Sequence, residues 1–146
     1  MKKILLTVVS QEMQLLKTQV EQITAPTVTG EITVLPEHIG LFSKLQTGEL
    51  KYLVDGKQES MVISDGFITV SPDSTVTVMV DAAKFAREIS LSKAQEAVEA
   101  AKNMVQISSE NRRELLMAEA SLRRALLELR IAQKSKSIMA VSYTHL

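Results

Sequence analysis

Cysteine is absent from this 146-residue chain, and His38 is the single histidine outside the final residues. Without cysteine there is neither a disulfide framework nor a thiolate metal site, which favours a reducing compartment. One histidine leaves no metal-ligand cluster and no Cys/His or Ser/His/Asp site, and no Gly-x-x-x-x-Gly-Lys phosphate loop is present. A Ser–Lys pair is the one such arrangement that composition leaves open. We therefore predict a protein that is not an enzyme and holds no metal ion and no cofactor.

Aromatic residues and long apolar runs are also scarce. Aromatics make up 3% of the chain and tryptophan is absent, so the 45% hydrophobic content must build an aliphatic core. The shortage of stacking aromatics, with an acidic first half, argues against nucleic-acid binding. No run reaches the ~18 apolar residues of a membrane-spanning helix. The apolar run over residues 1–9 stops at Ser10, too early for a signal peptide, and is predicted to be the first strand.

Glycine and proline are both missing after Pro72. This change marks a passage from turn-rich to helical chain. Residues 1–81 contain six lysines and ten acidic residues, a net charge of −4, whereas residues 82–146 contain 11 basic and seven acidic residues, a net charge of +4, and all six arginines. We predict two modules that face different partners, one over residues 1–81 and one over residues 82–137.

Short β-branched runs separated by turn signals fill the first module. Asp55-Gly56 and Asp65-Gly66 each predict a tight hairpin, because a two-residue turn needs positive φ at its centre. Residues 71–74 predict a third turn, and residues 75–80 alternate with period two, which indicates one buried face. The repeated short strands predict a β-sandwich. The candidate strands are 3–9, 12–23 with a break left open inside it, 31–35, 39–46, 49–54, 58–64, 67–71 and 75–80.

From Ala82 onward the apolar period becomes helical, and two stripes recur at three and four residues. The first stripe is Leu91, Ala94, Val98, Ala101 and Val105, and the second is Leu115, Ala118, Leu122, Ala125, Leu129 and Ala132. Ser92 with Gln95 predicts a capping box for the first helix, and Asn111 a cap for the second. A short connector predicts an antiparallel hairpin, and its alanines bury little surface, which makes it marginal alone. The predicted fold class is α+β, mainly β.

The stretch over residues 29–41 has the features of a docking edge. Gly30 can take positive φ and turn the chain before an extended run. Pro36 ends that run, because it lacks a backbone donor and restricts the residue before it. Glu31 and His38 are then predicted at the two ends of a short strand at a sheet edge. A surface loop position or a local hydrogen-bond partner is the ordinary alternative for His38.

Several stretches resemble the epsilon subunit of bacterial and plastid F-type ATP synthases. They are Gly30-Glu31-Ile32, Leu35-Pro36-Glu37-His38, the Leu41…Leu45…Gly48-Glu49-Leu50 run, Ile63-Ser64-Asp65-Gly66-Phe67 and Ala82-Ala83-Lys84-Phe85-Ala86-Arg87-Glu88-Ile89. The resemblance extends in order over residues 1–136. It implies an N-terminal β-sandwich followed by a C-terminal antiparallel two-helix hairpin, the fold that the patterning also predicts.

The resemblance implies a central-stalk (rotor) subunit that couples c-ring rotation to the catalytic head of a proton- or sodium-translocating synthase. The gamma subunit and the c-ring would be bound through Gly30, Glu31, Leu35, Pro36, Glu37 and His38. The hairpin would meet the beta (and alpha) subunits through Arg112, Arg113, Arg123 and Arg124 and restrain ATP hydrolysis. Such a subunit would lie peripherally on the cytoplasmic face of the plasma membrane, in preference to the plastid thylakoid.

One departure from the family concerns nucleotide binding. Members that bind ATP carry Ile-Asp-x-x-Arg-Ala at the first helix, where this chain has Ile89-Ser90-Leu91-Ser92-Lys93-Ala94. Ser90 lacks the carboxylate, and Lys93 is a point charge where arginine offers a bidentate fork. The resemblance therefore implies that ATP binding is weak or absent.

Two other readings stay open at the level of sequence: a freestanding nucleotide-sensing regulatory module, and a small enzyme on a β-sandwich. Recovery of synthase subunits with the tagged chain would separate the stalk reading from both. Residues 138–146, which include Tyr143 and His145, match no pattern of the helix before them. They resemble a translated library adapter, and we treat them as a non-native tail.

Overall fold

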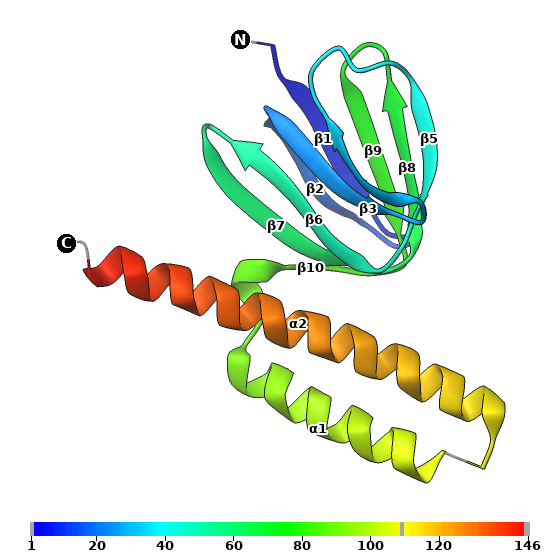
Figure 1. The fold of residues 1–146 in the computed structure, drawn as a ribbon. Helices are drawn as coiled ribbons and strands as arrows, with labels where there is room; N and C mark the ends of the chain where they lie inside the picture. Colours follow the sequence, from blue (N-terminus) through cyan, green and yellow to red (C-terminus); the bar gives the residue numbers. More distant parts are fainter. Residues whose placement is uncertain (1, 109, 145–146) are drawn as a thin grey trace. The chain divides into compact units, whose positions relative to one another are not determined.

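The computed structural model of the chain describes residues 2–108 and 110–144. The chain divides into two compact units, of which the first ends at Phe85 and the second begins at Ala86. Strands make up the first unit, and two long helices make up most of the second (Figure 1). The predicted α+β fold class, with a β-sandwich followed by a two-helix hairpin, is confirmed.

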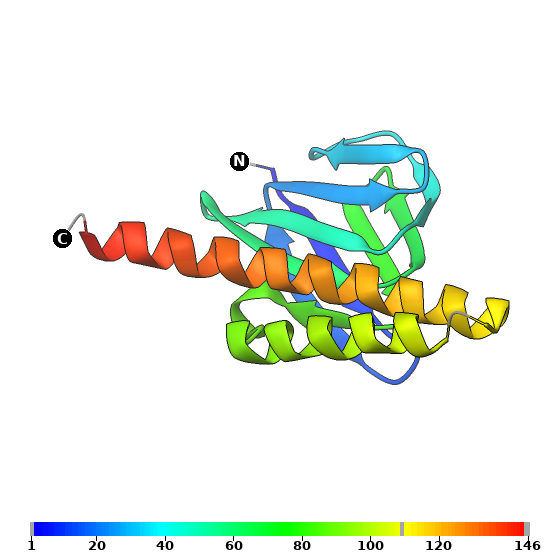
Figure 2. The same cartoon turned by 60° about the horizontal axis from the view of Figure 1, so that its bottom comes forward.

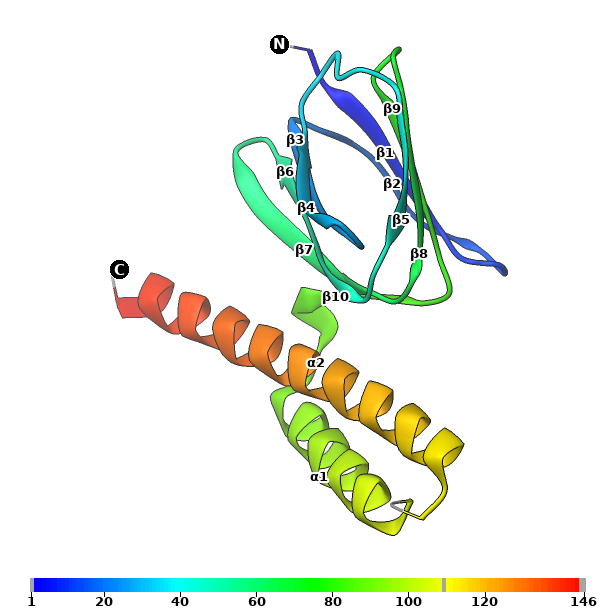
Figure 3. The same ribbon diagram turned by 45° about the vertical axis from the view of Figure 1, so that its right-hand side comes forward.

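Within the described residues the first unit contains ten strands. They are β1 (Ile4–Val9), β2 (Gln14–Val20), β3 (Gln22–Thr27), β4 (Gly30–Val34), β5 (Leu41–Leu45), β6 (Gly48–Val54), β7 (Lys57–Ile63), β8 (Gly66–Ser71), β9 (Thr75–Val80) and β10 (Ala83–Phe85). Figure 3 shows two facing layers, with β4, β3, β6 and β7 in one and β5, β8, β9, β1 and β2 in the other. The layers join where Thr27 of β3 pairs with Leu45 of β5. β1 runs parallel to β9, so the first long strand of the sandwich lies beside its last.

Alternate side chains of the strands fill the space between the layers. Ile4, Leu6 and Val8 of β1 are fully buried, and their neighbours along the strand are half-buried. β9 is buried at every second residue through most of its length, as its period-two sequence predicts. Burial of one such aliphatic side chain stabilises the fold by about 1.5–3 kcal/mol. The core cluster contains one aromatic residue, Tyr52, so the predicted aliphatic core is confirmed.

The two Asp-Gly pairs have different roles. Asp55 and Gly56 both have positive φ, at 52° and 81°, and join the antiparallel strands β6 and β7 as predicted. The hairpin predicted at Asp65-Gly66 is wrong, because β7 pairs with β6 and β10 whereas β8 pairs with β5 and β9. Glycine is needed there for another reason. A Cβ on Gly66 would lie 1.9 Å from the carbonyl oxygen of Met79.

The candidate over residues 12–23, for which a break was left open, is divided between β2 and β3, and β3 continues beyond the predicted end to Thr27 through Pro26. Proline is tolerated because its backbone faces β5, where its carbonyl accepts a hydrogen bond from the Gln46 amide and no donor is required. Residues 83–85, predicted as the start of helix, form β10 against β7 and are followed by a 3-10 turn, η1 (Ala86–Glu88).

The second unit is a hairpin of α1 (Leu91–Ile107) and α2 (Arg112–Thr144), which pack against each other. Asn111 caps α2 as predicted, since its Oδ1 accepts from the amides of Arg113 and Glu114. The cap predicted at Ser92 is wrong: α1 begins earlier, and the Ser90 hydroxyl accepts from the Lys93 amide at 3.4 Å. α2 continues into the suspected tail, of which residues 145–146 lie outside the described residues. No described helix is long and apolar enough to span a membrane.

Candidate docking surface

The turn between β3 and β4 fixes the start of the predicted docking edge. Gly30 has φ of 125°, a conformation that side-chain-bearing residues rarely adopt. The buried Thr27 hydroxyl donates to the Gly30 carbonyl and lies 3.2 Å from the Thr29 hydroxyl. Side chains of the turn itself therefore fix its conformation, and this fixes the position of Glu31, the second residue of β4.

β4 lies at the edge of its layer and pairs with β3 alone among the described strands. Figure 2 shows it as the outermost strand of that layer. The side chains of Glu31 and Thr33 are exposed, whereas Val34 is buried and Ile32 packs against the core. The predicted edge position is confirmed, and it leaves one long side of β4 open to a partner.

The loop after β4 carries the remaining predicted interface residues. Glu37 has φ of 67°, its amide donates to the Ser74 hydroxyl at 2.9 Å, and its carboxylate pairs with Lys2. His38 is half-buried, and its Nδ1 lies 2.7 Å from the Ile39 carbonyl oxygen. These contacts tie the loop to the β8–β9 turn and to the start of the chain. Glu31 and His38 are therefore separated by β4 and belong to different ends of one rim.

The structure adds an apolar surface that the sequence reasoning missed. Phe42 of β5 and Phe67 of β8 are exposed and stack with their ring centroids 5.5 Å apart. Met79 of β9 pairs with Phe67 across the strands and is also exposed. Beside them lies a shallow hollow of about 360 Å³ whose lining includes Lys44 and Asp81. Aromatic residues exposed in this way are frequent in protein–protein interfaces.

A signal for this surface was present in the sequence. In residues 41–45 the apolar residues at both ends and Ser43 between them occupy one face, which places Phe42 and Lys44 on the other. A single exposed phenylalanine is ordinary, and it becomes informative only when other apolar residues lie beside it in a patch. Phe42 stacks on Phe67 from a diagonal position, because β5 and β8 pair Phe42 with Thr69 and Lys44 with Phe67, and the sequence does not reveal this register.

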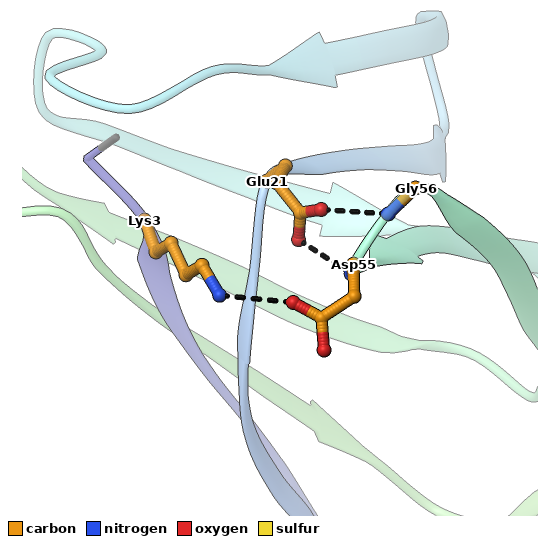
Figure 4. Close-up of polar contacts among 4 residues, drawn as sticks. All are labelled: Lys3, Glu21, Asp55 and Gly56. Carbon is orange, nitrogen blue, oxygen red and sulfur yellow. Dashed lines mark hydrogen bonds and ion pairs between the residues drawn. The ribbon is translucent and has the colours of Figure 1, made fainter.

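A polar clasp holds the end of the sandwich at which the chain begins (Figure 4). The Glu21 carboxylate accepts from two successive amides of the β6–β7 turn, those of Asp55 at 3.1 Å and Gly56 at 2.9 Å. Lys3 in turn pairs with the Asp55 carboxylate at 3.1 Å. The clasp connects residues of both layers, because Lys3 precedes β1 and Glu21 precedes β3. Its role is structural: it holds the β6–β7 turn against the segments that precede β1 and β3.

The positions predicted on the hairpin divide between surface and structure. Arg112, Arg113 and Arg123 are exposed and Arg124 is half-buried, all on α2. At the degenerate nucleotide motif Ile89 is half-buried and Ala94 is buried. The Ser90 hydroxyl is occupied as the cap of α1 by the amide of Lys93. The motif residues thus have structural roles within the helix start.

Nothing in the described residues points to catalysis. No group of three or more histidine, cysteine, aspartate or glutamate side chains there is placed to hold a metal ion. Every buried side-chain nitrogen or oxygen in the described part has a hydrogen-bond partner. The exposed β4 edge, the loop after it and the Phe42–Phe67 surface are all suited to contact with another protein.

Comparison with known proteins gives a consistent result. Residues 3–86 match the family model described as ATP synthase, Delta/Epsilon chain, beta-sandwich domain. The ATP synthase epsilon chain of Dehalococcoides mccartyi is 36% identical over 136 residues, which are 93% of this chain and 96% of that relative. The epsilon chain of Syntrophobacter fumaroxidans is 37% identical over 133 residues, covering 91% and 98%.

Solved structures agree on the fold. A chain in the cryo-EM structure of the Euglena gracilis mitochondrial ATP synthase, OSCP/F1/c-ring, superposes with a TM-score of 0.74 at 28% identity, covering 92% of this chain and 81% of that one. A chain of the Tetrahymena thermophila mitochondrial ATP synthase, central stalk/c-ring, gives a TM-score of 0.51 at 19% identity, over 60% of this chain and 70% of that one.

Proposed function

This chain belongs to the ATP synthase epsilon chain family, as a non-catalytic subunit, and from that premise we propose that it works as a rotor subunit of the central stalk. It couples rotation of the c-ring to the catalytic head of a proton- or sodium-translocating F-type synthase. Its sandwich binds the gamma subunit and the c-ring, and its hairpin restrains ATP hydrolysis by contact with the beta (and alpha) subunits. It lies peripherally on the cytoplasmic face of the plasma membrane.

The rim formed by β4 and the loop after it carries this proposal. The rim is exposed, yet Gly30 and Glu37 have positive φ, the Glu37 amide donates to Ser74 of the β8–β9 turn, and His38 contacts the carbonyl of the adjacent Ile39. A preformed rim loses little conformational entropy when it binds. The proposed ring contacts are the exposed Glu31 carboxylate and the segment from Leu35 to His38.

The apolar Phe42–Phe67 surface supports a second partner. It lies on β5 and β8, in the layer that does not contain β4 (Figure 3). A stalk subunit must bind two neighbours at once, and two separate surfaces on the sandwich meet that need. We assign the Phe42–Phe67 surface to the gamma subunit, because exposed aromatic anchors are typical of tight, water-excluding contacts.

Purification of the tagged chain from its native membranes tests the stalk role. Gamma, beta and c subunits should be recovered with it, and Glu31→Gln should lower the proton-pumping yield per ATP without unfolding the chain. Glu12→Gln, at an exposed position of the β1–β2 turn, serves as the control. Recovery of the chain with no synthase subunit would reject the proposal.

The proposed restraint of hydrolysis is tested on the hairpin. Replacing Arg123 and Arg124 together by alanine should raise the ATP hydrolysis rate of the assembled enzyme at least about twofold, because close interfacial charge pairs are lost. Lys102→Ala on α1, whose ammonium pairs with Glu99 at 3.8 Å, is the control. An unchanged rate in the arginine variant would remove the hairpin arginines from the mechanism.

Weak or absent ATP binding remains part of the proposal. The Ser90 hydroxyl is engaged as a helix cap and Ala94 is buried, so neither is presented to a nucleotide. Isothermal titration of the purified chain with ATP should give no binding at micromolar concentration. Tight binding by the chain alone would instead favour a freestanding nucleotide sensor.

A further inference from the structure

Sulfur chemistry in this chain belongs to methionine, because cysteine is absent. Met61 is 1% exposed and belongs to the core of the sandwich, where a solvent oxidant does not reach it. Four methionines of the described residues are exposed: Met13, Met79, Met104 and Met117. Peroxides convert exposed thioethers to sulfoxides, which are polar. What surrounds each of the four therefore decides whether its oxidation has a consequence.

Met79 lies between two apolar side chains on the outer face of the sheet. Its neighbours along β9, Val78 and Val80, are buried, whereas Met79 itself is 45% exposed. The register places Phe67 of β8 directly opposite Met79 on one side and Val9 of β1 directly opposite it on the other. Side chains in such positions have their Cβ atoms about 5 Å apart. Met79 is therefore the middle of an apolar row that crosses three strands.

The shallow hollow beside this row leaves Met79 accessible to a small oxidant, because Met79 and Phe67 both line it. The other exposed methionines have different surroundings. Met13 lies in the β1–β2 turn, and Met104 and Met117 lie on α1 and α2. Among the four, only Met79 lies opposite an exposed aromatic side chain in the register of the described strands.

We propose that Met79 is a redox-sensitive modification site, whose oxidation to the sulfoxide weakens binding of the partner at the Phe42–Phe67 surface. The oxidant is a hydroperoxide, hydrogen peroxide in the simplest case. The Met79 sulfur attacks one peroxide oxygen, the S–O bond forms as the O–O bond breaks, and the other oxygen leaves as water. Sulfur loses two electrons and the peroxide gains them. The inference rests on the proposed function, which assigns this surface to the gamma subunit.

The sulfoxide changes the chemistry of the row and leaves its position unchanged. A thioether is apolar and makes favourable contacts with aromatic rings, whereas a sulfoxide is polar and carries an oxygen that accepts hydrogen bonds. Neither Phe67 nor Val9 has a side-chain donor for that oxygen. Burial of an unpaired acceptor beneath a partner corresponds to binding that is roughly 5- to 150-fold weaker. The fold should stay intact, since Met79 lies outside the core cluster.

Peroxide treatment of the full chain, followed by titration with purified gamma subunit, tests the proposal. Each chain is compared with its own untreated sample, so that the effect of a substitution itself cancels. The unmodified chain should bind gamma at least about tenfold more weakly after treatment. Met79→Leu cannot be oxidised at this position and should lose less than about twofold. Met117→Leu removes a methionine that is 68% exposed on α2, and should lose as much as the unmodified chain.

Peptide mapping by mass spectrometry links the loss to one sulfur atom. The affinity should fall in step with the sulfoxide fraction at Met79 while Met61 stays unmodified, and methionine sulfoxide reductases of both epimer specificities should restore it. Met61 oxidised as fast as Met79 would overturn the proposal, because the loss would then reflect an opened core. So would affinity that stays low after Met79 has been reduced again.

The remaining outcomes separate this inference from the function on which it rests. An equal loss of affinity in Met79→Leu, or unchanged binding by a chain oxidised at Met79, would overturn the redox site and leave the stalk role intact. Absence of gamma binding by the untreated chain would reject the assignment of the Phe42–Phe67 surface to gamma, and the redox site together with it.

Discussion

The sandwich and the hairpin differ in how completely they bury their side chains. The largest fully buried side chains of the described residues, Ile4 and Leu6 among them, all belong to the sandwich. The hairpin cluster contains Val98, Ala101 and Ala125, and its two leucines are only partly buried. Because stabilisation follows the apolar area removed from water, the sandwich is the more stable unit. The two helices are therefore held together by less buried apolar surface than the layers of the sandwich.

The largest effect is expected at the closest backbone approach in the sandwich. Gly66→Ala places a methyl group 1.9 Å from the Met79 carbonyl oxygen, so β8 and β9 must move apart. The change should lower the free energy of unfolding by about 3 kcal/mol or more, measured by urea denaturation of the full chain. Gly40→Ala, where the nearest atoms lie at 3.6 Å, should cost much less. Equal losses would show that the close approach of Gly66 to the Met79 carbonyl is not what makes glycine necessary there.

A matched pair of valines tests the comparison itself. Val8 of β1 is fully buried, and Val98 of α1 is 4% exposed in a core made largely of alanine. Val8→Ala should cost about 2–3 kcal/mol because the surrounding layers leave a cavity, and Val98→Ala about 1 kcal/mol because its neighbours can close in. Amide exchange in β9 and in α1 reports the two losses separately. The comparison fails if Val98→Ala costs as much as Val8→Ala.

The clasp at Glu21 should contribute less than the core does. Glu21→Gln replaces a carboxylate whose two oxygens each accept a hydrogen bond from a backbone amide. A glutamine side chain has only one oxygen that can accept. We expect a loss of about 1–2 kcal/mol in urea denaturation, confined to the sandwich. Glu12→Gln, on an exposed turn, is expected to be neutral. A change in α1 exchange in the Glu21 variant would mean that the two units are coupled.

The smallest effect is expected at the start of the hairpin. Ser90→Ala removes the hydroxyl that caps α1 and should cost about 1 kcal/mol, seen as faster amide exchange in the first turn of that helix. Ser92→Ala is the matched control and should have almost no effect, because Ser92 lies inside the helix. A larger loss for Ser92→Ala than for Ser90→Ala would instead support the cap predicted from the Ser92/Gln95 spacing.

The sequence predicted those parts of the fold that depend on local pattern. Alternation located most strands, and Asp55-Gly56 identified one hairpin because its backbone requirement is local. Asp65-Gly66 has the same two residues, yet glycine is required there because a side chain would clash with the backbone of Met79, which lies on another strand. The strand at residues 83–85 forms because it pairs with β7, and the local composition there, which is typical of a helix, did not predict it.

The candidate site was predictable to the same extent. Gly30 located the turn before β4 because it can take positive φ, and Pro36 located the end of the strand because it lacks a backbone donor. The stacked pair of Phe42 and Phe67 was missed because it needs the register of two strands that are distant in sequence. Comparison with the ATP-binding motif showed only that Ser90 stands where that motif has an aspartate. The role of Ser90 as a cap was not predicted, because it depends on where the helix begins.

The parallel pairing of β1 with β9 imposes an order on how this protein is made. β1 leaves the ribosome before its partner, which follows about seventy residues later, and this takes roughly 4–14 s at ordinary synthesis rates. Until then the β1–β2 hairpin exposes one unprotected flank to any other nascent chain nearby. Fast translation of residues 1–80 would shorten that exposure, and slow codons before β9 would prolong it.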